Sequence, residues 1–366
     1  MTPLKRRIAE LIIAVGPIPV SEYMALCLFD PDAGYYTTRE PFGAAGDFIT
    51  APEVSQMFGE LVAVWLYEAW RAIGSPMPVT LAEIGPGRGT LMKDMLRTLR
   101  RLDPAFAGAA TIALIEASPR LREVQKETLA DTSKAIDWHE TVASLPEAPL
   151  LIVGNELFDA IPIRQFARTA DGWRERMVGL DAKGELGFYA GAASLDPSLL
   201  PSDAKTAPDG TVVEAAPARS ALMQTIADHI VVRGGAGLFF DYGHLQPGVG
   251  DTLQAMRSHQ YEDVLANPGE ADLTSHVDFA ALAATTRASG LRADFTTQGS
   301  FLLGMGLLER AGQLGAGADE AMRERISSEA ERLAGPQAMG ELFKVLAIAH
   351  EDVALPVFRS RIDQPE

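Results

Sequence analysis

The stretch LAEIGPGRGTLMKDM, residues 81–95, decides the fold that this sequence predicts. An apolar run over 79–84 carries the acid Glu83 near its end. Three glycines follow at alternate positions: Gly85, Gly87 and Gly89. Thr90 is placed to cap a helix, and apolar residues recur at helical spacing over 91–99. A strand, a glycine turn and a helix in this order form the nucleotide site of open α/β sheets.

The spacing of these glycines distinguishes three kinds of nucleotide loop. A phosphate loop ends in Gly-Lys-Ser/Thr, and the corresponding Gly87-Arg88-Gly89-Thr90 has no lysine. A dinucleotide fingerprint reads G-x-G-x-x-G, whereas here the third glycine comes one position early. The order E-x-G-x-G-x-G is the form used by S-adenosylmethionine (SAM) methyltransferases. Glycines allow close backbone approach to such a cofactor, and Glu83 can face its amino group. A tight turn without a ligand is the alternative.

A second acid strengthens the interpretation of a nucleoside site. The run TIALIE over 111–116 follows the glycines after one helix and one loop, as the second strand of a βαβ unit should, and it ends in Glu116. A carboxylate at this position can accept both ribose hydroxyls of an adenosine. Ser118 and Pro119 then open the next helix as N-cap and first helical residue.

Composition and charge narrow the class of protein. The chain has 366 residues, a formal net charge of −17 and a pI near 4.8. This acidity argues against DNA or RNA as the main partner, because phosphate binding needs a basic surface. Cys27 is the only cysteine, which excludes an internal disulfide and indicates a reducing compartment. No apolar run approaches the ~20 residues of a membrane span, and the six histidines show no metal-ligand spacing. We predict a cytoplasmic protein without membrane insertion or metal site, with an organelle form left open.

The order of patterns along the chain predicts two regions. Residues 1–77 read as a mainly helical N-terminal region, in which Ser21 caps a second helix and 30–36 form a turn into an extended piece. Residues 78–366 read as an α/β domain, with insertions at about 163–232 and 245–276 that include a hairpin at Asp171-Gly172. Strands are expected at 79–84, 111–116, 135–139, 150–154, 236–241, 291–295 and 343–349.

Candidate catalytic residues follow the later strands, because ligands of open α/β sheets bind beyond the carboxyl ends of strands. The polar candidates after 150–154 and 236–241 are Asn155, Glu156, Asp159, Asp241 and His244, with His276 further along. Helix capping by Asn155 and surface placement of the acids are the alternative. The loop GAAGDFITAPE, residues 43–53, resembles a lid over a cofactor, so Asp47 and Thr50 are candidates there, although ordinary loop and cap residues would read the same way.

With these stretches in view, the chain resembles the MidA-like family of class I methyltransferases. The matching stretches are GDFITAPEVSQMFGE (46–60), EIGPGRGTLM (83–92), GNELFDAIPI (154–163), FFDYGH (239–244) and DLTSHVDF (272–279). The resemblance implies a Rossmann-like sheet of seven strands, mostly parallel with an antiparallel last strand, and SAM as cofactor. It also implies a protein arginine as substrate. For mitochondrial members it implies symmetric dimethylation of a core subunit of respiratory complex I during assembly.

The chemistry of arginine methylation suggests roles for the candidates. A guanidinium is protonated at neutral pH, so carboxylates must localise its charge and free one nitrogen. Glu156 and Asp159 are the candidates for this role, with Asn155 orienting the substrate. His244, and more weakly Asp241 and His276, are candidates for proton removal. Glu83, Gly85, Gly87, Gly89, Glu116, Asp47 and Thr50 are the candidate cofactor residues.

Three classes of function remain open from the sequence. The first is a protein methyltransferase, which needs a protein substrate and leaves a homodimer open. The second is an assembly factor that binds SAM and a partner but acts mainly by binding. The third is a nicotinamide-dependent oxidoreductase, against which the glycine spacing speaks.

Overall fold

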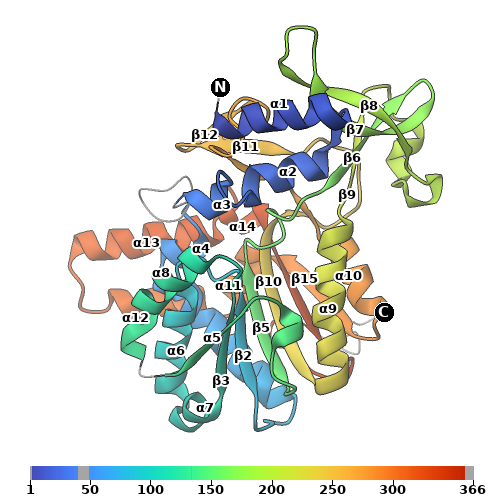
Figure 1. The fold of residues 1–366 in the computed structure, drawn as a ribbon. Coiled ribbons are helices and arrows are strands. Elements are labelled where there is room, and N and C mark those ends of the chain that lie inside the picture. Colours follow the sequence, from blue (N-terminus) through green and yellow to red (C-terminus); the bar gives the residue numbers. More distant parts are fainter. Residues whose placement is uncertain (1, 40–48, 133, 359–366) are drawn as a thin grey trace. The chain divides into compact units, whose positions relative to one another are not determined.

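The computed structural model describes residues 2–39, 49–132 and 134–358 (Figure 1). Two compact units divide the chain, and each takes three segments of it. The first unit comprises Met1–Phe48, Phe158–Ala221 and Gln246–Asp278, and the second Ile49–Leu157, Leu222–Leu245 and Phe279–Glu366. Residues 49–77 thus group with the second unit, whereas the sequence pattern places them in the N-terminal region 1–77. The predicted domain boundaries stay a prediction.

The second unit is built on the predicted Rossmann-like sheet. Among the described residues its strands are β2 (Thr80–Ile84), β3 (Thr111–Ile115), β4 (Ile136–His139), β5 (Leu150–Asn155), β10 (Gly235–His244), β15 (Arg292–Thr297) and β16 (Phe343–Ala349). They lie in the order β15-β16-β10-β5-β2-β3-β4. The pairs from β4 to β10 are parallel, and β16 runs antiparallel to both β10 and β15. This confirms the mostly parallel sheet with an antiparallel last strand.

Helices cover both faces of this sheet, with α5 and α6 to one side and α9 and α10 to the other in Figure 1. Their bounds are α4 (Ala51–Val54), α5 (Gln56–Ala72), α6 (Thr90–Leu102), α7 (Pro104–Ala109), α8 (Pro119–Leu129), α9 (Pro217–Arg233), α10 (Phe279–Ala288), α11 (Gln298–Gly304), α12 (Leu307–Gly315), α13 (Glu320–Ala334) and α14 (Met339–Leu342), with 3-10 turns at Ala130–Thr132 and Val142–Ser144. Every residue of β2 and β5 is buried. Parallel strands that are buried on both faces have continuous apolar sequences, and this pattern is why their positions could be predicted.

The first unit is smaller and antiparallel. Its helices are α1 (Pro3–Val15), α2 (Val20–Phe29) and α3 (Tyr35–Thr38), and its strands are β1 (Ile18–Pro19), β6 (Arg164–Thr169), β7 (Gly172–Leu180), β8 (Leu186–Ser194), β9 (Val212–Ala215), β11 (Gln254–Arg257), β12 (Gln260–Glu262), β13 (Asp272–Thr274) and β14 (Val277–Asp278), with 3-10 turns at Pro197–Leu199 and Ser202–Thr206. One sheet runs β1-β7-β6-β9 with β8 beside β7, and a second runs β12-β11-β13. Thr169 pairs with Gly172 across the predicted hairpin turn, where Gly172 has φ +99°.

Two local predictions in the N-terminal region are wrong. Ser21 lies inside α2, which begins at Val20 after Pro19 and has no side-chain cap. The piece expected to be extended forms α3 instead, because Gly34 lets the chain turn back onto Asp30: their backbones join at 2.8 Å, and a Cβ at Gly34 would lie 2.5 Å from the Asp30 nitrogen. Short polar turns of this kind resemble strand entries in sequence because both contain glycine and aspartate.

The start of β10 should tolerate no side chain. Gly235 has φ +134°, and a Cβ there would overlap the carbonyl oxygen of Leu150 on the neighbouring β5. Gly235→Ala is therefore expected to lower the free energy of unfolding by more than about 3 kcal/mol, measured by chemical denaturation. The adjacent Gly234→Ala is the matched control, because its φ is +83° and nothing lies within 4 Å. The control should lose only about 1–2 kcal/mol, and equal losses in both variants would contradict the clash.

Candidate cofactor and active site

The turn after β2 adopts the conformation that its glycines predict. Gly85, Gly87 and Gly89 have φ angles of +67°, +51° and +83°, a region that residues with a Cβ rarely adopt. Gly89 is the N-cap of α6 and Thr90 its first residue, so the prediction that Thr90 caps this helix is wrong. The left-handed glycine already turns the chain into the helix, which leaves the Thr90 hydroxyl available for another partner.

That partner is Glu53 of α4. Its Oε1 accepts a hydrogen bond from the Thr90 hydroxyl at 2.6 Å, and its Oε2 lies 3.8 Å from Nη1 of Arg88. The sequence pattern around Glu53 suggested no specific role for it. Thr50 precedes α4, is half-buried and makes no capping hydrogen bond with its side chain. Asp47 lies outside the described residues. The cofactor roles of Thr50 and Asp47 stay predictions.

Glu83 is buried beside the turn. Its side chain is 3% exposed, and its carboxylate accepts a hydrogen bond from the backbone N–H of Met92 in the first turn of α6. The other oxygen, Oε2, has no hydrogen-bond partner among the described residues. Burial raises the pKa of Glu83 from 4.5 to about 8, because removal from water disfavours the charged form. A buried acceptor of this kind is one that a donor of a bound ligand can satisfy.

The pKa of Glu83 predicts a pH dependence for the cofactor-free protein. Between the ordinary value of 4.5 and about 8, the folded protein holds a proton that the unfolded chain releases. The free energy of unfolding should therefore fall as pH rises from about 7 to about 8, by up to about 1.4 kcal/mol per pH unit. Asp94, whose pKa burial raises to about 6, titrates below this window. Denaturation across the window measures the slope. Glu83→Gln should flatten it, and an unchanged slope in that variant would assign the effect to another group.

Glu116 follows β3 as predicted, and Ser118 caps α8 by accepting a hydrogen bond from Leu121 N–H, with Pro119 as the first helical residue. The carboxylate of Glu116 accepts hydrogen bonds from the backbone N–H of Ser118 at 2.7 Å and from Nε2 of Gln125 at 3.2 Å. Burial raises its pKa despite these donors. The carboxylate is therefore held in one direction beside the glycine turn.

The end of β5 carries Asn155 and Glu156. Asn155 is 9% exposed, and its Nδ2 donates to Oε1 of Glu156 at 3.0 Å. Its Oδ1 is buried without a hydrogen-bond partner among the described residues. Glu156 has φ +51°, and its backbone N–H donates to the Phe240 carbonyl at 2.9 Å. Few glutamates adopt this backbone conformation, so the surrounding structure must stabilise it. Backbone strain of this kind is common at functional sites. Asn155 is part of the strand and does not cap a helix.

Parallel strands bring these residues to one edge of the sheet. Glu83, Glu116 and Asn155 lie at the carboxyl ends of β2, β3 and β5, which are neighbours in the order β5-β2-β3. On the adjacent β10, Asp241 is fully buried and accepts a hydrogen bond from Tyr242 N–H at 2.9 Å. His244 is the last residue of that strand and is half-buried. Of the candidates that the sequence places after β5 and β10, the structure thus gathers Asn155, Glu156, Asp241 and His244 within the second unit, but not Asp159.

Asp159 and His276 belong to the first unit. Their backbone carbonyls accept hydrogen bonds from Arg219, a residue for which the sequence predicted no role. Arg219 is 2% exposed. Its guanidinium donates to the carbonyls of Asp159 at 3.1 Å, Ile161 at 3.3 Å and His276 at 2.7 Å, and to the Ser275 hydroxyl at 2.5 Å. Within the first unit, one buried arginine therefore joins the backbone at 159–161 to that at 275–276. It gave no sequence signal, because its partners are mostly backbone carbonyls.

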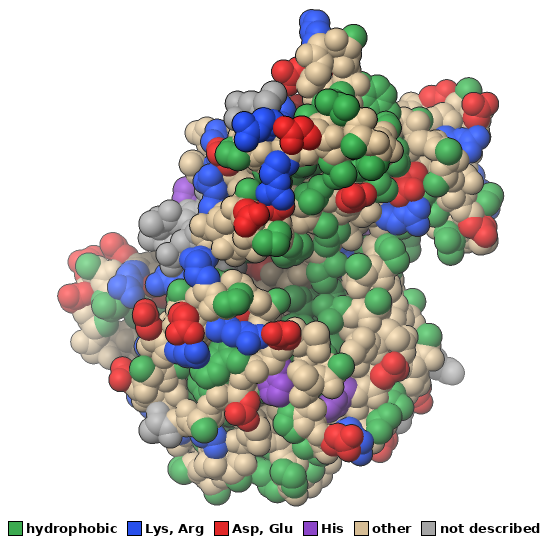
Figure 2. Space-filling view, viewed as in Figure 1, with side chains coloured by type: hydrophobic (Ala, Val, Ile, Leu, Met, Phe, Trp, Pro, Cys, Tyr) green, Lys and Arg blue, Asp and Glu red, His purple; other side chains and the backbone are tan. Residues whose placement is uncertain are grey.

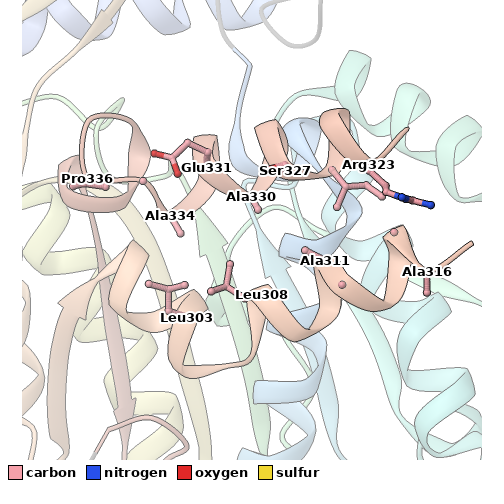
Figure 3. Close-up of a pocket in the computed structure, with 14 residues that line it drawn as sticks. Leu303, Leu308, Ala311, Ala316, Arg323, Ser327, Ala330, Glu331, Ala334 and Pro336 are labelled. Carbon is pink, nitrogen blue, oxygen red and sulfur yellow. The ribbon is translucent and has the colours of Figure 1, made fainter. Parts of the chain in front are cut away.

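A separate cavity of about 620 Å³ lies between α12 and α13 (Figure 3). Its walls are mostly small or apolar, including Leu308, Ala311 and Ala330, with the charged Arg323 and Glu331 also at its lining. None of the candidate cofactor or catalytic residues that the structure describes lines it. This cavity is therefore not the predicted site.

Among the described residues, Lys and Arg side chains lie near Asp and Glu side chains on the face shown in Figure 2. Within the described residues, none of the helices combines the length and apolar character needed to cross a membrane.

The residues at the carboxyl edge fit SAM. The glycine turn presents backbone without Cβ atoms, as close approach of a ligand requires. Among the described residues the buried Oε2 of Glu83 has no donor, and the amino group of SAM is such a donor. The Glu116 carboxylate is a suitable acceptor for ribose hydroxyls. These residues would hold the cofactor.

Comparisons with known proteins agree with this geometry. The Methyltransf_28 family model, which describes S-adenosyl-L-methionine-dependent methyltransferases, matches residues 61–297. The chain is 36% identical to the mitochondrial protein arginine methyltransferase NDUFAF7 of Danio rerio, over 94% of this chain and 86% of that protein. It is 33% identical to NDUFAF7 of Homo sapiens, over 95% of this chain and 83% of that protein.

A solved structure is similar along nearly the whole chain. It is the crystal structure of a COG1565 superfamily member from Burkholderia thailandensis bound to S-adenosyl-homocysteine. It is 29% identical with a TM-score of 0.85, and the match covers 98% of this chain and 96% of that one. From the glycine turn, the family match and relatives aligned over most of both chains, we conclude that this protein is a SAM-dependent methyltransferase of the Methyltransf_28 family.

Proposed function

We propose that this methyltransferase modifies arginine side chains of a protein, and that it forms symmetric dimethylarginine. The observation that carries the proposal is the end of β5, where a buried amide oxygen of Asn155 without a partner among the described residues adjoins the Glu156 carboxylate. Relatives named protein arginine methyltransferase support it.

Oxygen acceptors suit a guanidinium, which presents five N–H donors in one plane and stays protonated at neutral pH. Glu156 would accept two of these donors and localise the positive charge away from one nitrogen. Asn155 would accept a further donor through Oδ1 and so orient the plane. When bound, SAM supplies the methyl group. Asp159 is proposed as the second carboxylate, and His244 as the group that takes the proton, with Asp241 and His276 as weaker candidates.

The acceptor protein is proposed to be a core subunit of respiratory complex I, methylated during assembly, as the MidA-like resemblance implies. The relatives are named mitochondrial, which supports a matrix location over the cytoplasmic location that the sequence predicts. The homodimer stays a prediction.

The test uses SAM with a labelled methyl group and peptides that tile the arginines of complex I core subunits. Mass spectrometry would locate the label and identify its arginine derivative. Peptides with lysine in place of each arginine are the control for the acceptor. Transfer to an arginine peptide, lost in its lysine counterpart, is the expected result. Transfer to lysine instead would overturn the arginine assignment.

An assembly factor that acts mainly by binding is the second candidate, because it would use the same glycines and acids. It predicts tight SAM binding together with stable complexes with a core subunit, and no methyl transfer to that subunit. The family match removes the support for a nicotinamide-dependent oxidoreductase.

A further inference from the structure

One fully buried amide connects four elements around the glycine turn. Gln125 lies on α8 and is 0% exposed. Its Nε2 donates to the Gly87 carbonyl at 2.9 Å and to Oε2 of Glu116 at 3.2 Å. Its Oε1 accepts a hydrogen bond from the indole Nε1 of Trp138 on β4 at 3.0 Å. The glycine turn, the end of β3, α8 and β4 therefore meet at one side chain.

Trp138 fixes which way the amide faces. An indole N–H only donates, whereas the Gly87 carbonyl and an ionised Glu116 carboxylate only accept. The amide oxygen must face Trp138, and the NH₂ group must face the other two. The opposite orientation would set a donor against a donor and an acceptor against two acceptors. Buried polar groups rarely remain unpaired in this way.

We propose that Gln125 is a positioning residue for the cofactor, which holds Glu116 at a fixed distance from the glycine turn so that its carboxylate faces the ribose hydroxyls. The inference rests on the ribose role proposed for Glu116. It does not depend on which acceptor is methylated. The proposal gives Gln125 no contact with the ribose, since its NH₂ group already donates to Gly87 and Glu116 and its amide oxygen accepts from Trp138.

Packing alone predicts a different outcome from positioning. The other buried residues of α8 on this face are Leu121 and Leu129, so an apolar residue of the same length at position 125 would keep the packing. If Gln125 only fills space, such a residue leaves cofactor recognition unchanged. If Gln125 positions Glu116, an apolar residue at position 125 specifically weakens the part of the cofactor affinity that comes from the ribose.

The test compares two probes by calorimetric titration: S-adenosylhomocysteine and its analogue that lacks the ribose 2′-hydroxyl. The wild type should prefer the intact ribose by about tenfold or more, since an unpaired acceptor remains when the hydroxyl is absent. Gln125→Met should bind S-adenosylhomocysteine about 10- to 100-fold more weakly, by analogy with the loss of a group that orients a metal ligand. It should also lose most of the preference between the probes. Glu116→Gln should lose the preference as well.

Two further variants separate orientation from packing. Gln224→Met is the matched control, because Gln224 on α9 donates to Asp228 and Ser289 and lies outside the cofactor residues; it should keep both affinities. Trp138→Phe keeps Gln125 but removes the donor that orients it, and should reduce the preference in the same direction. This variant also tests the proposal if Gln125→Met does not fold.

The proposal is overturned if Gln125→Met folds and keeps the wild-type preference for the intact ribose. It is equally overturned if the wild type itself shows no such preference, because Glu116 then has no ribose role to be positioned for. Neither result bears on arginine methylation, which the peptide assay measures separately.

Discussion

Binding of S-adenosylhomocysteine is expected to disappear when Gly87 is replaced by valine. Gly87 has φ +51°, and a β-branched side chain strongly disfavours this left-handed conformation, which costs about 1–2 kcal/mol even for ordinary residues. Any relaxation moves the Gly87 carbonyl away from Nε2 of Gln125, 2.9 Å distant. The valine side chain would also occupy the space that the ligand needs. A loss of at least about 100-fold is expected, because each tenfold change needs only about 1.4 kcal/mol.

The control for Gly87→Val introduces a similar backbone cost elsewhere. Gly172 has φ +99° at the hairpin of the first unit, and a Cβ added there would meet nothing within 4 Å. Gly172→Val should lower the unfolding midpoint while binding stays at the wild-type level. Calorimetric titration and thermal denaturation of both variants separate the two effects. Retained binding in folded Gly87→Val would show that the cofactor does not approach this turn.

Methyl transfer is expected to fall by about 10² to 10⁴-fold in Glu156→Gln, while affinity for S-adenosylhomocysteine stays unchanged. The substitution keeps the size of the side chain and removes the charge that would localise the positive charge of the substrate. The carboxylate of Glu156 accepts a hydrogen bond from Asn155, and its backbone N–H bonds to Phe240 on β10, so both contacts lie away from the glycine turn. Rates with the labelled peptides and titration with the product measure the two effects.

An exposed glutamate supplies the matched control. The side chain of Glu140 is 80% exposed after β4 and lies 3.9 Å from Arg122, so Glu140→Gln removes the same charge from a side chain that has no proposed role in binding or catalysis. This variant should turn over at the wild-type rate. Full turnover in Glu156→Gln with intact binding would remove Glu156 from the proposed chemistry, and Asp159→Asn would then be the next variant to measure.

The central strands of the second unit could be predicted because they are buried on both faces. The runs that the sequence marked at 79–84 and 150–154 correspond to Thr80–Ile84 and Leu150–Asn155. The acids Glu83 and Glu116 were visible for a related reason, since a charged residue ends each apolar run. Burial on both faces makes the strands apolar, whereas ligand binding at their carboxyl ends requires polar residues such as these two acids.

Other features depend on contacts that sequence periodicity does not contain. Gln125 left a faint signal, a polar residue within the buried stripe of Leu121 and Leu129, but its three partners come from other elements. Arg219 left none, because its partners include carbonyls 57 and 58 residues away. The capping prediction for Thr90 was wrong for a local reason: left-handed Gly89 occupies the N-cap position that a threonine pattern suggested.

The segmented composition of the first unit has a consequence for the order in which the chain can fold during synthesis. The apolar faces of α1 and α2, including Leu4, Ile8 and Met24, are covered by residues as late as Leu265 and Leu273. Thr2 and Tyr23 likewise donate to the carbonyls of Pro268 and Val264. Helices α1 and α2 are therefore synthesised well before the residues that complete their core. Delays of this kind leave apolar surface exposed to other chains, so we expect these two helices to need a chaperone while the rest of their core is synthesised.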